Sequence, residues 1–243
     1  MKLHIANPDP NGQVLQMPAW IPGGYLIRDF SKHIESIEAF ASSDSKKVIA
    51  LERIDNDHER LPPVNSAVDI LTAVYAFDSS VRAAYLDTEC TFFNATSLCL
   101  AVNGQERLPC SLAIPSPEQA FADQWSVHTT LRSVKTDGRG FGFYLAQNYD
   151  DLLDHPVAMG EFQVIHWQSN GVPHRIAIQG CNCIVDIKRI SQDLQAICAS
   201  TINLFEPKTK RAPFGEYHFL VNAVLNGYGG LEHRHNSTAL LSR

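Results

Sequence analysis

The pattern of hydrophobic and polar residues over about the first 150 positions predicts many short β-strands. The clearest is 68–77 (VDILTAVYAF), which is apolar on both faces and ends at Asp78-Ser79-Ser80. Such a run is typical of a strand buried inside a sandwich. Further strands are predicted at 14–17, 47–53, 97–102, 125–131 and 142–146, separated by turn signals such as Asn103-Gly104. Many strands without helices between them predict an antiparallel β-sandwich or saddle.

The pattern changes after about residue 155, where a mixed α+β region is expected. Segments 161–167 and 174–179 predict two strands joined across Asn170-Gly171, and 217–225 predicts another strand before a Gly-rich turn at 227–230. Between them, one helix is predicted from about 191 to 205, with Ser191 as its cap and Pro207 as its stop. Its apolar stripe is formed by Ile190, Leu194, Ile197, Cys198 and Thr201. The expected domains are therefore 1–155 and 156–243.

Composition and charge exclude several classes of protein. The chain has 243 residues, of which 44% are hydrophobic, and its formal net charge is −6. Because no run of Lys and Arg exceeds two residues, we expect no nucleic-acid partner. No apolar segment is long enough to span a membrane, and the N-terminal residues do not resemble a signal peptide. A cytoplasmic location is therefore expected.

The cysteines and histidines predict no metal site within this chain. The six Cys residues are too sparse for a disulfide scaffold, and Cys181-Asn182-Cys183 has no second pair at zinc-ribbon spacing. An HExxH zinc motif, a G-x-S-x-G elbow and a P-loop are absent from the sequence. On one strand His233 and His235 would point the same way, but two ligands alone do not form a zinc site. Buried thiols and separate histidines are the expected outcome.

The most unusual local sequence is Gly229-Gly230-Leu231-Glu232-His233, directly after a predicted strand. Glycines in a strand let another backbone approach closely, so an extended peptide could pair with this edge. The Glu232 carboxylate could then receive the terminal ammonium group of that peptide. The alternative interpretation is a β-bulge with a solvated glutamate. These five residues are the candidate substrate-binding residues, and no catalytic residue is predicted.

Five segments together resemble the glycyl aminopeptidase family, metallopeptidase family 61. In chain order they are Pro18 to Tyr25 (PAWIPGGY) with Arg28-Asp29-Phe30, Tyr75 to Asp78 with Ser80-Val81-Arg82, Phe92 to Ser97 (FFNATS), Tyr149 to Val157 (YDDLLDHPV), and the GGLEH segment. The resemblance implies a mainly β fold. An antiparallel β-sandwich or saddle domain would be followed by the first α+β part of a thermolysin-like catalytic domain.

The resemblance also implies an activity for the longer parent protein. Such a protein would be a zinc aminopeptidase that removes small N-terminal residues, Gly or Ala, from peptides. Glu232 would bind the α-amino group, and the backbone of 229–231 would flank the scissile peptide bond. The family's HExxH lies downstream of GGLEH, so we expect this chain alone to hold no zinc and to be inactive. Ala158 departs from the family pattern, which has Glu at that position.

Alternative interpretations accompany these segments. Trp20, Pro22, Gly23 and Tyr25 are expected to form a rigid turn with core aromatic rings, and Arg28-Asp29 and Arg82 to form structural ion pairs. The whole chain could instead be a non-catalytic β-sandwich module that binds a peptide or a protein. A carbohydrate-binding sandwich would rest on Trp20, Trp125 or Trp167. Uncovered apolar faces within 161–225 predict self-association.

Overall fold

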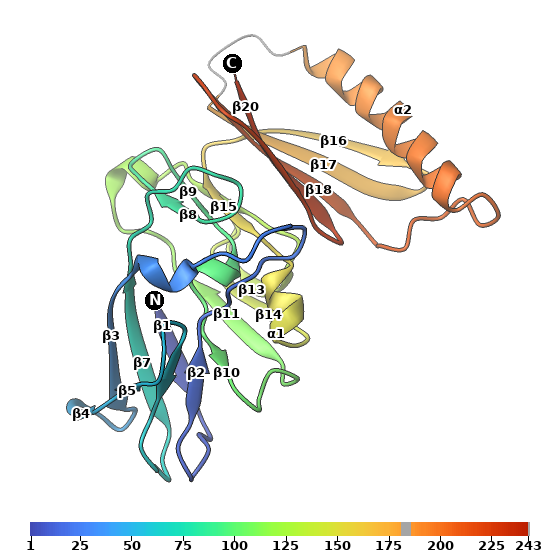
Figure 1. Cartoon of the computed structure of the whole chain (residues 1–243). Helices are drawn as coiled ribbons and strands as arrows, with labels where there is room; N and C mark the ends of the chain where they lie inside the picture. Colours follow the sequence, from blue (N-terminus) through green and yellow to red (C-terminus); the bar gives the residue numbers. More distant parts are fainter. Residues whose placement is uncertain (181–185, 243) are drawn as a thin grey trace.

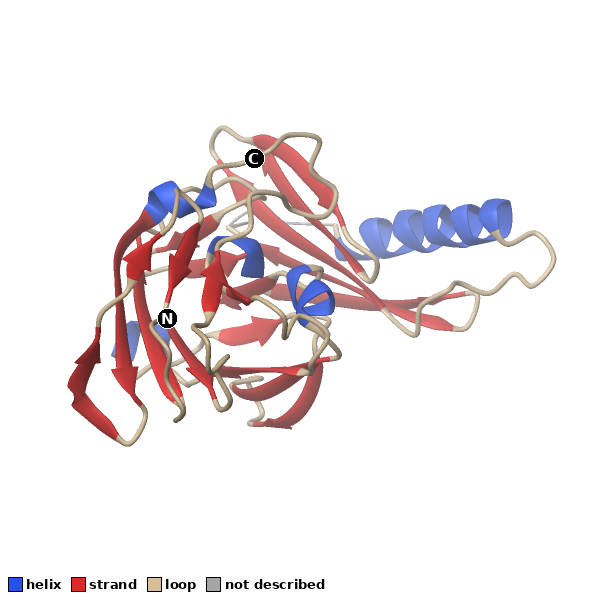
Figure 2. Cartoon of the chain, turned by 60° about the horizontal axis from the view of Figure 1, so that its bottom comes forward, coloured by secondary structure: helices blue, strands red, loops and turns tan. Residues whose placement is uncertain are grey.

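The computed structural model describes residues 1–180 and 186–242. Within these residues the strands form five sheets, accompanied by two α-helices and three 3₁₀ helices, so the chain is mainly β (Figures 1 and 2). None of the described helices is long and apolar enough to cross a membrane. The predicted Cys181-Asn182-Cys183 feature lies outside the described residues.

Two antiparallel sheets form a first sandwich around one core. The first sheet has the order β1 (Lys2–Ile5), β7 (Val68–Val74), β3 (Ile34–Ala41) and β4 (Asp44–Ile49). The second has the order β10 (Ala101–Val102), β2 (Val14–Gln16), β6 (His58–Arg60) and β5 (Glu52–Arg53). Side chains from both sheets, including Leu15 and Ile70, are fully buried between them. The mainly β fold with several antiparallel sheets that the sequence predicted is confirmed.

Two more antiparallel sheets enclose a second core. One has the order β11 (Cys110–Ile114), β14 (Gly142–Ala146) and β13 (Arg132–Thr136). The other has the order β12 (Ser126–His128), β15 (Val157–Gly160), β9 (Cys90–Phe93) and β8 (Ala84–Leu86). The short helix α1 (Tyr149–Leu153), which the sequence did not predict, packs on this core and is capped by the side chain of Asn148. The 3₁₀ helices are η1 (Phe30–His33), η2 (Ala95–Ser97) and η3 (Ala120–Ala122).

The C-terminal residues form a mixed five-stranded sheet. Its order is β16 (Gln163–Ser169), β17 (Val172–Gln179), β18 (Tyr217–Val224), β20 (Asn236–Ser242) and β19 (Tyr228–Glu232). Strands β17, β18 and β20 are mutually parallel, and α2 (Ile187–Phe205) lies in the crossover between β17 and β18. Figure 1 shows α2 on one face of this sheet and the other four sheets beyond the opposite face.

Local signals account for the first hairpin and for the helix. Asn170 and Gly171 both have positive φ angles, 51° and 76°, which is the conformation that a two-residue type I′ turn requires between β16 and β17. The predicted hairpin is therefore confirmed. The helix starts earlier than predicted: the Asp186 side chain, and not Ser191, caps it by accepting a hydrogen bond from the Arg189 backbone N–H at 3.0 Å.

Several predicted strands differ in extent from those observed. Segment 47–53 is divided between β4 and β5, and 97–102 contains the last residue of η2, three residues outside helices and strands, and the two residues of β10. Segment 125–131 contains only the three residues of β12, whereas 142–146 coincides with β14. The Gly-rich segment 227–230 is not a turn, since Tyr228, Gly229 and Gly230 belong to β19.

The five-stranded sheet shares the core of the first sandwich. Leu231 of β19 and Leu240 of β20 are buried with Leu15, Met17 and Ile21. On the opposite face, Cys198 of α2 is buried against β16 and β17. The residues of β19 are thus held against the N-terminal sheets through one face only.

Candidate functional site

The candidate site is the outer strand of the five-stranded sheet. Strand β19 pairs antiparallel with β20 on one side and lies at the end of the strand order, so its other side has no strand beside it within the described part of the chain. Gly229, Gly230, Leu231 and Glu232 are in this strand, and His233 follows it directly. The GGLEH segment is therefore an edge strand rather than the alternative β-bulge.

The pairing register shows which backbone groups of β19 face outward. The His233 N–H donates to the Asn236 carbonyl at 2.8 Å, which closes the β19–β20 hairpin. Hydrogen-bonded pairs alternate along an antiparallel ladder, so Leu231 and Gly229 also bond to β20. Gly230 and Glu232 consequently direct their N–H and C=O groups away from β20. These are the groups that an added peptide strand would pair with.

Side chains alternate along β19 in the same way. Leu231 and His233 are buried, whereas Tyr228, Gly230 and Glu232 are exposed on the opposite face. A Cβ atom at Gly230 would have no heavy atom closer than the Thr238 carbonyl oxygen at 3.9 Å. The exposed face thus presents a carboxylate next to a position without a side chain.

The first family segment covers the Glu232 end of this edge. An ideal Cβ at Gly23, whose φ angle is +80°, would lie 2.7 Å from the Glu232 carbonyl oxygen. Only glycine allows such a close approach of the two backbones. Because this contact occupies the outward carbonyl of Glu232, the open part of the edge is at Tyr228 to Gly230.

The second family segment touches the other end of the strand. The side chain of Val81 lies 3.6 Å from the position of a Cβ atom at Gly229. Val81 also accepts, through its carbonyl, a hydrogen bond from the buried Asn94 amide at 2.9 Å. Asn94 belongs to the third family segment, so that segment is connected to β19 through Val81.

The fourth family segment anchors the end of β19 through an ion pair. Nδ1 of His233 lies 3.0 Å from Oδ1 of Asp154, and both side chains are buried. Arg234 adds a second contact, since its Nε lies 3.2 Å from the other carboxylate oxygen. Burial acts to raise the pKa of Asp154, but the hydrogen bond and charge of His233, with Arg234, lower it overall. Sequence reasoning missed Asp154 because 79 residues separate it from His233.

A groove of about 460 Å³ opens beside this anchor. The imidazole rings of His155 and His235 stack in it, with centroids 5.6 Å apart. Two carboxylates, Asp151 and Glu216, also line it. Burial lowers the pKa of His155 although the nearby Asp151 carboxylate acts to raise it. His235 thus faces His155 and not His233, so the two histidines considered as a metal pair are not brought together.

Tyr217 lies on the same face of the sheet as Glu232. Its hydroxyl group and that of Ser237 are 2.6 Å apart, and Ser237 is the residue of β20 directly opposite Glu232. Burial raises the pKa of Tyr217, and the negative charge of Glu232 adds to this effect. The sequence contained no signal for Tyr217, because its relation to Glu232 depends on the strand order β18-β20-β19.

A zinc ion does not fit the side chains described. No group of three or more His, Cys, Asp or Glu side chains in 1–180 and 186–242 could hold a metal ion. His233 is committed to Asp154, and His235 to its stacking on His155. No chemical step is therefore assigned to a metal within this chain.

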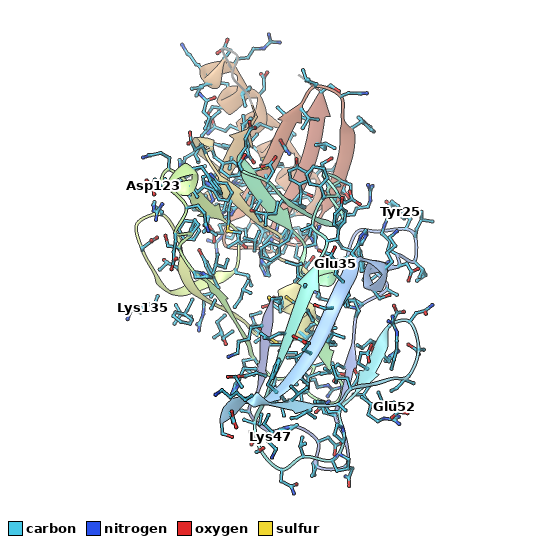
Figure 3. The ribbon with its side chains drawn as sticks, turned by 90° about the vertical axis from the view of Figure 1, so that its left-hand side faces the viewer. Tyr25, Glu35, Lys47, Glu52, Asp123 and Lys135 are labelled. Carbon is cyan, nitrogen blue, oxygen red and sulfur yellow. The ribbon has the colours of Figure 1, made fainter. Side chains whose placement is uncertain are left out.

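The structure corrects two expectations about the N-terminal segments. Gly24 N–H bonds to the Ile21 carbonyl in a tight turn, but Trp20 is 48% exposed and is not a core ring. Tyr25 is 98% exposed and lies at the surface (Figure 3). None of the ion pairs among the described residues involves Arg28 or Arg82. Trp125 and Trp167 are buried, which removes most of the aromatic surface that carbohydrate binding would need.

Comparison with known families identifies the chain. The profile of the Peptidase M61 N-terminal domain matches residues 1–161. The chain belongs to the M61 peptidase family. An aminopeptidase N family protein from Idiomarina loihiensis is 40% identical to this M61 chain, with a TM-score of 0.91 over 100% of it. No curated protein matches the chain.

The M61 chain is shorter than the solved structures it resembles. It spans 39% of the length of the Idiomarina loihiensis protein. Native yeast LTA4 hydrolase also aligns, at 11% identity and a TM-score of 0.51. The alignment covers 99% of this chain and 35% of the LTA4 hydrolase chain. Similarity at that identity shows a shared fold and no more.

Ala158 is the residue at which this M61 chain departs from the pattern noted in its sequence. It lies in β15 and is buried against Ala177 and Leu220 of the five-stranded sheet. Its surroundings are therefore apolar, and its side chain contributes to packing between the sheet that contains β15 and the five-stranded sheet.

Proposed function

We propose that this chain is the N-terminal part of a zinc aminopeptidase that removes small N-terminal residues, Gly or Ala, from peptides. The observation that carries the proposal is the exposed carboxylate of Glu232 on an edge strand, beside which no further strand lies within the described residues. A peptide added along this edge would pair with Gly230, and its ammonium group would meet Glu232. A free N-terminus is the feature that distinguishes an aminopeptidase substrate.

The rest of the proposal concerns the organisation of the protein. Residues 156–243 are assigned to the start of a thermolysin-like catalytic domain after a β-rich domain at 1–155. The mixed sheet with its crossover helix α2 supports this division. The chain alone is expected to bind peptides without hydrolysing them, because its described residues assemble no zinc site.

A binding measurement tests the role of Glu232. Calorimetry with Gly-Gly-Phe and with its N-acetylated form should show binding of the free peptide at least tenfold tighter, because only it carries an ammonium group. The E232Q variant should lose that preference. The E118Q variant changes another exposed glutamate, far from Glu232 in the sequence, and should keep the preference for the free peptide. Turnover of a glycyl anilide by this chain, with stoichiometric zinc, would contradict the inactive-fragment interpretation.

A non-catalytic peptide- or protein-binding module is the second candidate. It is favoured by the position of β19 at the edge of the sheet, where a peptide strand can be added without any chemistry. If the acetylated peptide binds as tightly as the free one and E232Q has no effect, this candidate replaces the first.

Self-association and a cytoplasmic location complete the proposal. Ile197, Leu204 and Phe205 of α2 are exposed by 59%, 73% and 76%, which leaves an apolar helix surface open to a second copy. The cysteines among the described residues, Cys90, Cys99, Cys110 and Cys198, are free thiols, as is usual in a reducing compartment. Burial raises the pKa of Cys99 to about 12, so this thiol is protonated and unreactive.

A further inference from the structure

A second pocket, distinct from the groove beside His235, lies where the first two family segments meet. Its volume is about 250 Å³, and its walls are the residues around η1 and the loop between β7 and β8. The charged or titratable side chains that line it are Arg28, Asp29, Lys32, His33, Asp78 and Arg82. The aminopeptidase proposal uses none of them.

The cationic groups of this pocket lack partners in the described chain. Among the described residues, Arg28, Lys32 and Arg82 take part in none of the ion pairs, and the Nε atom of Arg28 is buried without a hydrogen-bond acceptor. A buried donor left unsatisfied is destabilising, and more so when it is charged. An acceptor that enters the pocket would remove this destabilisation.

Two carboxylates, Asp29 and Asp78, also line the pocket. Oδ1 of Asp78 accepts the Ser80 backbone N–H at 2.8 Å, whereas the Ser31 hydroxyl, 3.4 Å from Oδ1 of Asp29, donates to Oδ1 of Asp57 at 2.7 Å. Three permanent cations thus face two carboxylates. The pocket carries an excess of positive charge and of unused donors.

Both walls of the pocket are tied to the candidate peptide-binding edge. The loop that carries Arg28 holds Gly23 against the Glu232 carbonyl, and the loop that carries Arg82 places Val81 against Gly229. The backbone N–H of Arg28 donates to the Ala19 carbonyl and so closes the first loop at its base. The two guanidinium groups are therefore positioned by the same contacts that hold β19.

We propose that this pocket binds a carboxylate through Arg28 and Arg82. A guanidinium group presents paired N–H donors in a plane that match the two oxygens of a carboxylate, whereas Lys32 adds only charge. The carboxylate can belong to the C-terminus of a peptide or to a free small anion. The proposal does not depend on catalysis or on the role of Glu232.

Titrations followed by NMR of the arginine Nε–H groups test it on the whole chain. The probes are Gly-Gly-Gly, its C-terminal amide, acetate and inorganic phosphate, at low ionic strength. Gly-Gly-Gly should shift the Nε–H signals of Arg28 and Arg82, and its amide should not. Equal shifts with acetate would assign the site to free carboxylates. The proposal would be overturned if only phosphate shifted these signals, or if none of the four probes did.

Two conservative variants separate binding from folding. R28K and R82K keep the charge but lose the paired donors, so each should weaken carboxylate binding at least tenfold. R107Q changes an exposed arginine outside the pocket and should bind as the unmodified chain does. E232Q should leave carboxylate binding unchanged, so a failure of this site is distinguishable from a failure of the aminopeptidase proposal. Normal binding by R28K and R82K would overturn the assignment.

Discussion

Nδ1 of His233 lies 3.0 Å from Oδ1 of Asp154, and the side chains of both residues are at most 5% exposed. This contact joins the end of the candidate peptide-binding strand to the residue that follows α1. A buried pair of this kind is costly to break, because the partner that remains is left uncompensated. The position of β19 relative to the N-terminal sheets therefore depends on it.

Removing the charge of Asp154 should destabilise the chain. We expect D154N to lower the free energy of unfolding by about 3 kcal/mol, because His233 would lose its buried charged partner. Urea unfolding at pH 7 followed by circular dichroism measures this change. D123N, at an exposed aspartate without an ion pair among the described residues, should change it by no more than about 0.5 kcal/mol. Equal effects of the two substitutions would contradict the structural role of the pair.

Two glycines near Glu232 should respond differently to alanine. At Gly23 the φ angle is +80° and a Cβ would lie 2.7 Å from the Glu232 carbonyl oxygen, so G23A should cost about 2 kcal/mol of stability. At Gly230 a Cβ would meet only the Thr238 carbonyl oxygen at 3.9 Å, an ordinary contact, so G230A should be neutral to within about 0.5 kcal/mol. Thermal unfolding of the two variants measures this difference. If G23A is as stable as G230A, the loop is not held against β19.

Acid should weaken the fold through buried histidines. Burial, with the charges of Arg175, His218 and His166, lowers the pKa of His128 from 6.5 to about 4. Between these values the unfolded chain binds a proton that the folded chain does not, so stability is lost as the pH falls from 6.5 toward 4. One such group contributes about 3 kcal/mol over that range.

Urea unfolding at several pH values measures this loss. The H128Q variant should show a shallower decrease in stability between pH 6.5 and pH 4, since glutamine does not titrate. A slope that is the same in H128Q and in the unmodified chain would exclude His128 as a source of acid sensitivity.

The exposed surface of α2 should drive self-association. Light scattering at increasing protein concentration is expected to show dimers or larger species, because Ile197 and Leu204 present apolar surface to solvent. The double variant I197E/L204E should be monomeric, while K188E, on the same helix, should behave as the unmodified chain. If light scattering shows only the monomer of the unmodified chain at high concentration, this prediction is wrong.

The strands, the hairpin and the helix were predictable because their signals are local. Asn170-Gly171 specifies a two-residue turn through its own backbone conformations. The apolar stripe of α2 is likewise read from one stretch of sequence. The helix start was misplaced because two caps compete, and the Asp186 side chain is the one that meets a free backbone N–H. The segment 227–230 was misjudged because glycines signal a turn unless a neighbouring strand pairs with them.

The sequence by itself determined that this chain is mainly β, that one amphipathic helix follows a hairpin, and that its motifs resemble those of M61 peptidases. Only the tertiary structure decided what those motifs do to one another. Asp154 meets His233, Gly23 meets Glu232, and Arg28 and Arg82 line the same pocket. The physical reason is that each of these contacts joins residues far apart along the chain. Local propensity and spacing contain no information about such contacts, because the contacts form only when the sheets pack against one another.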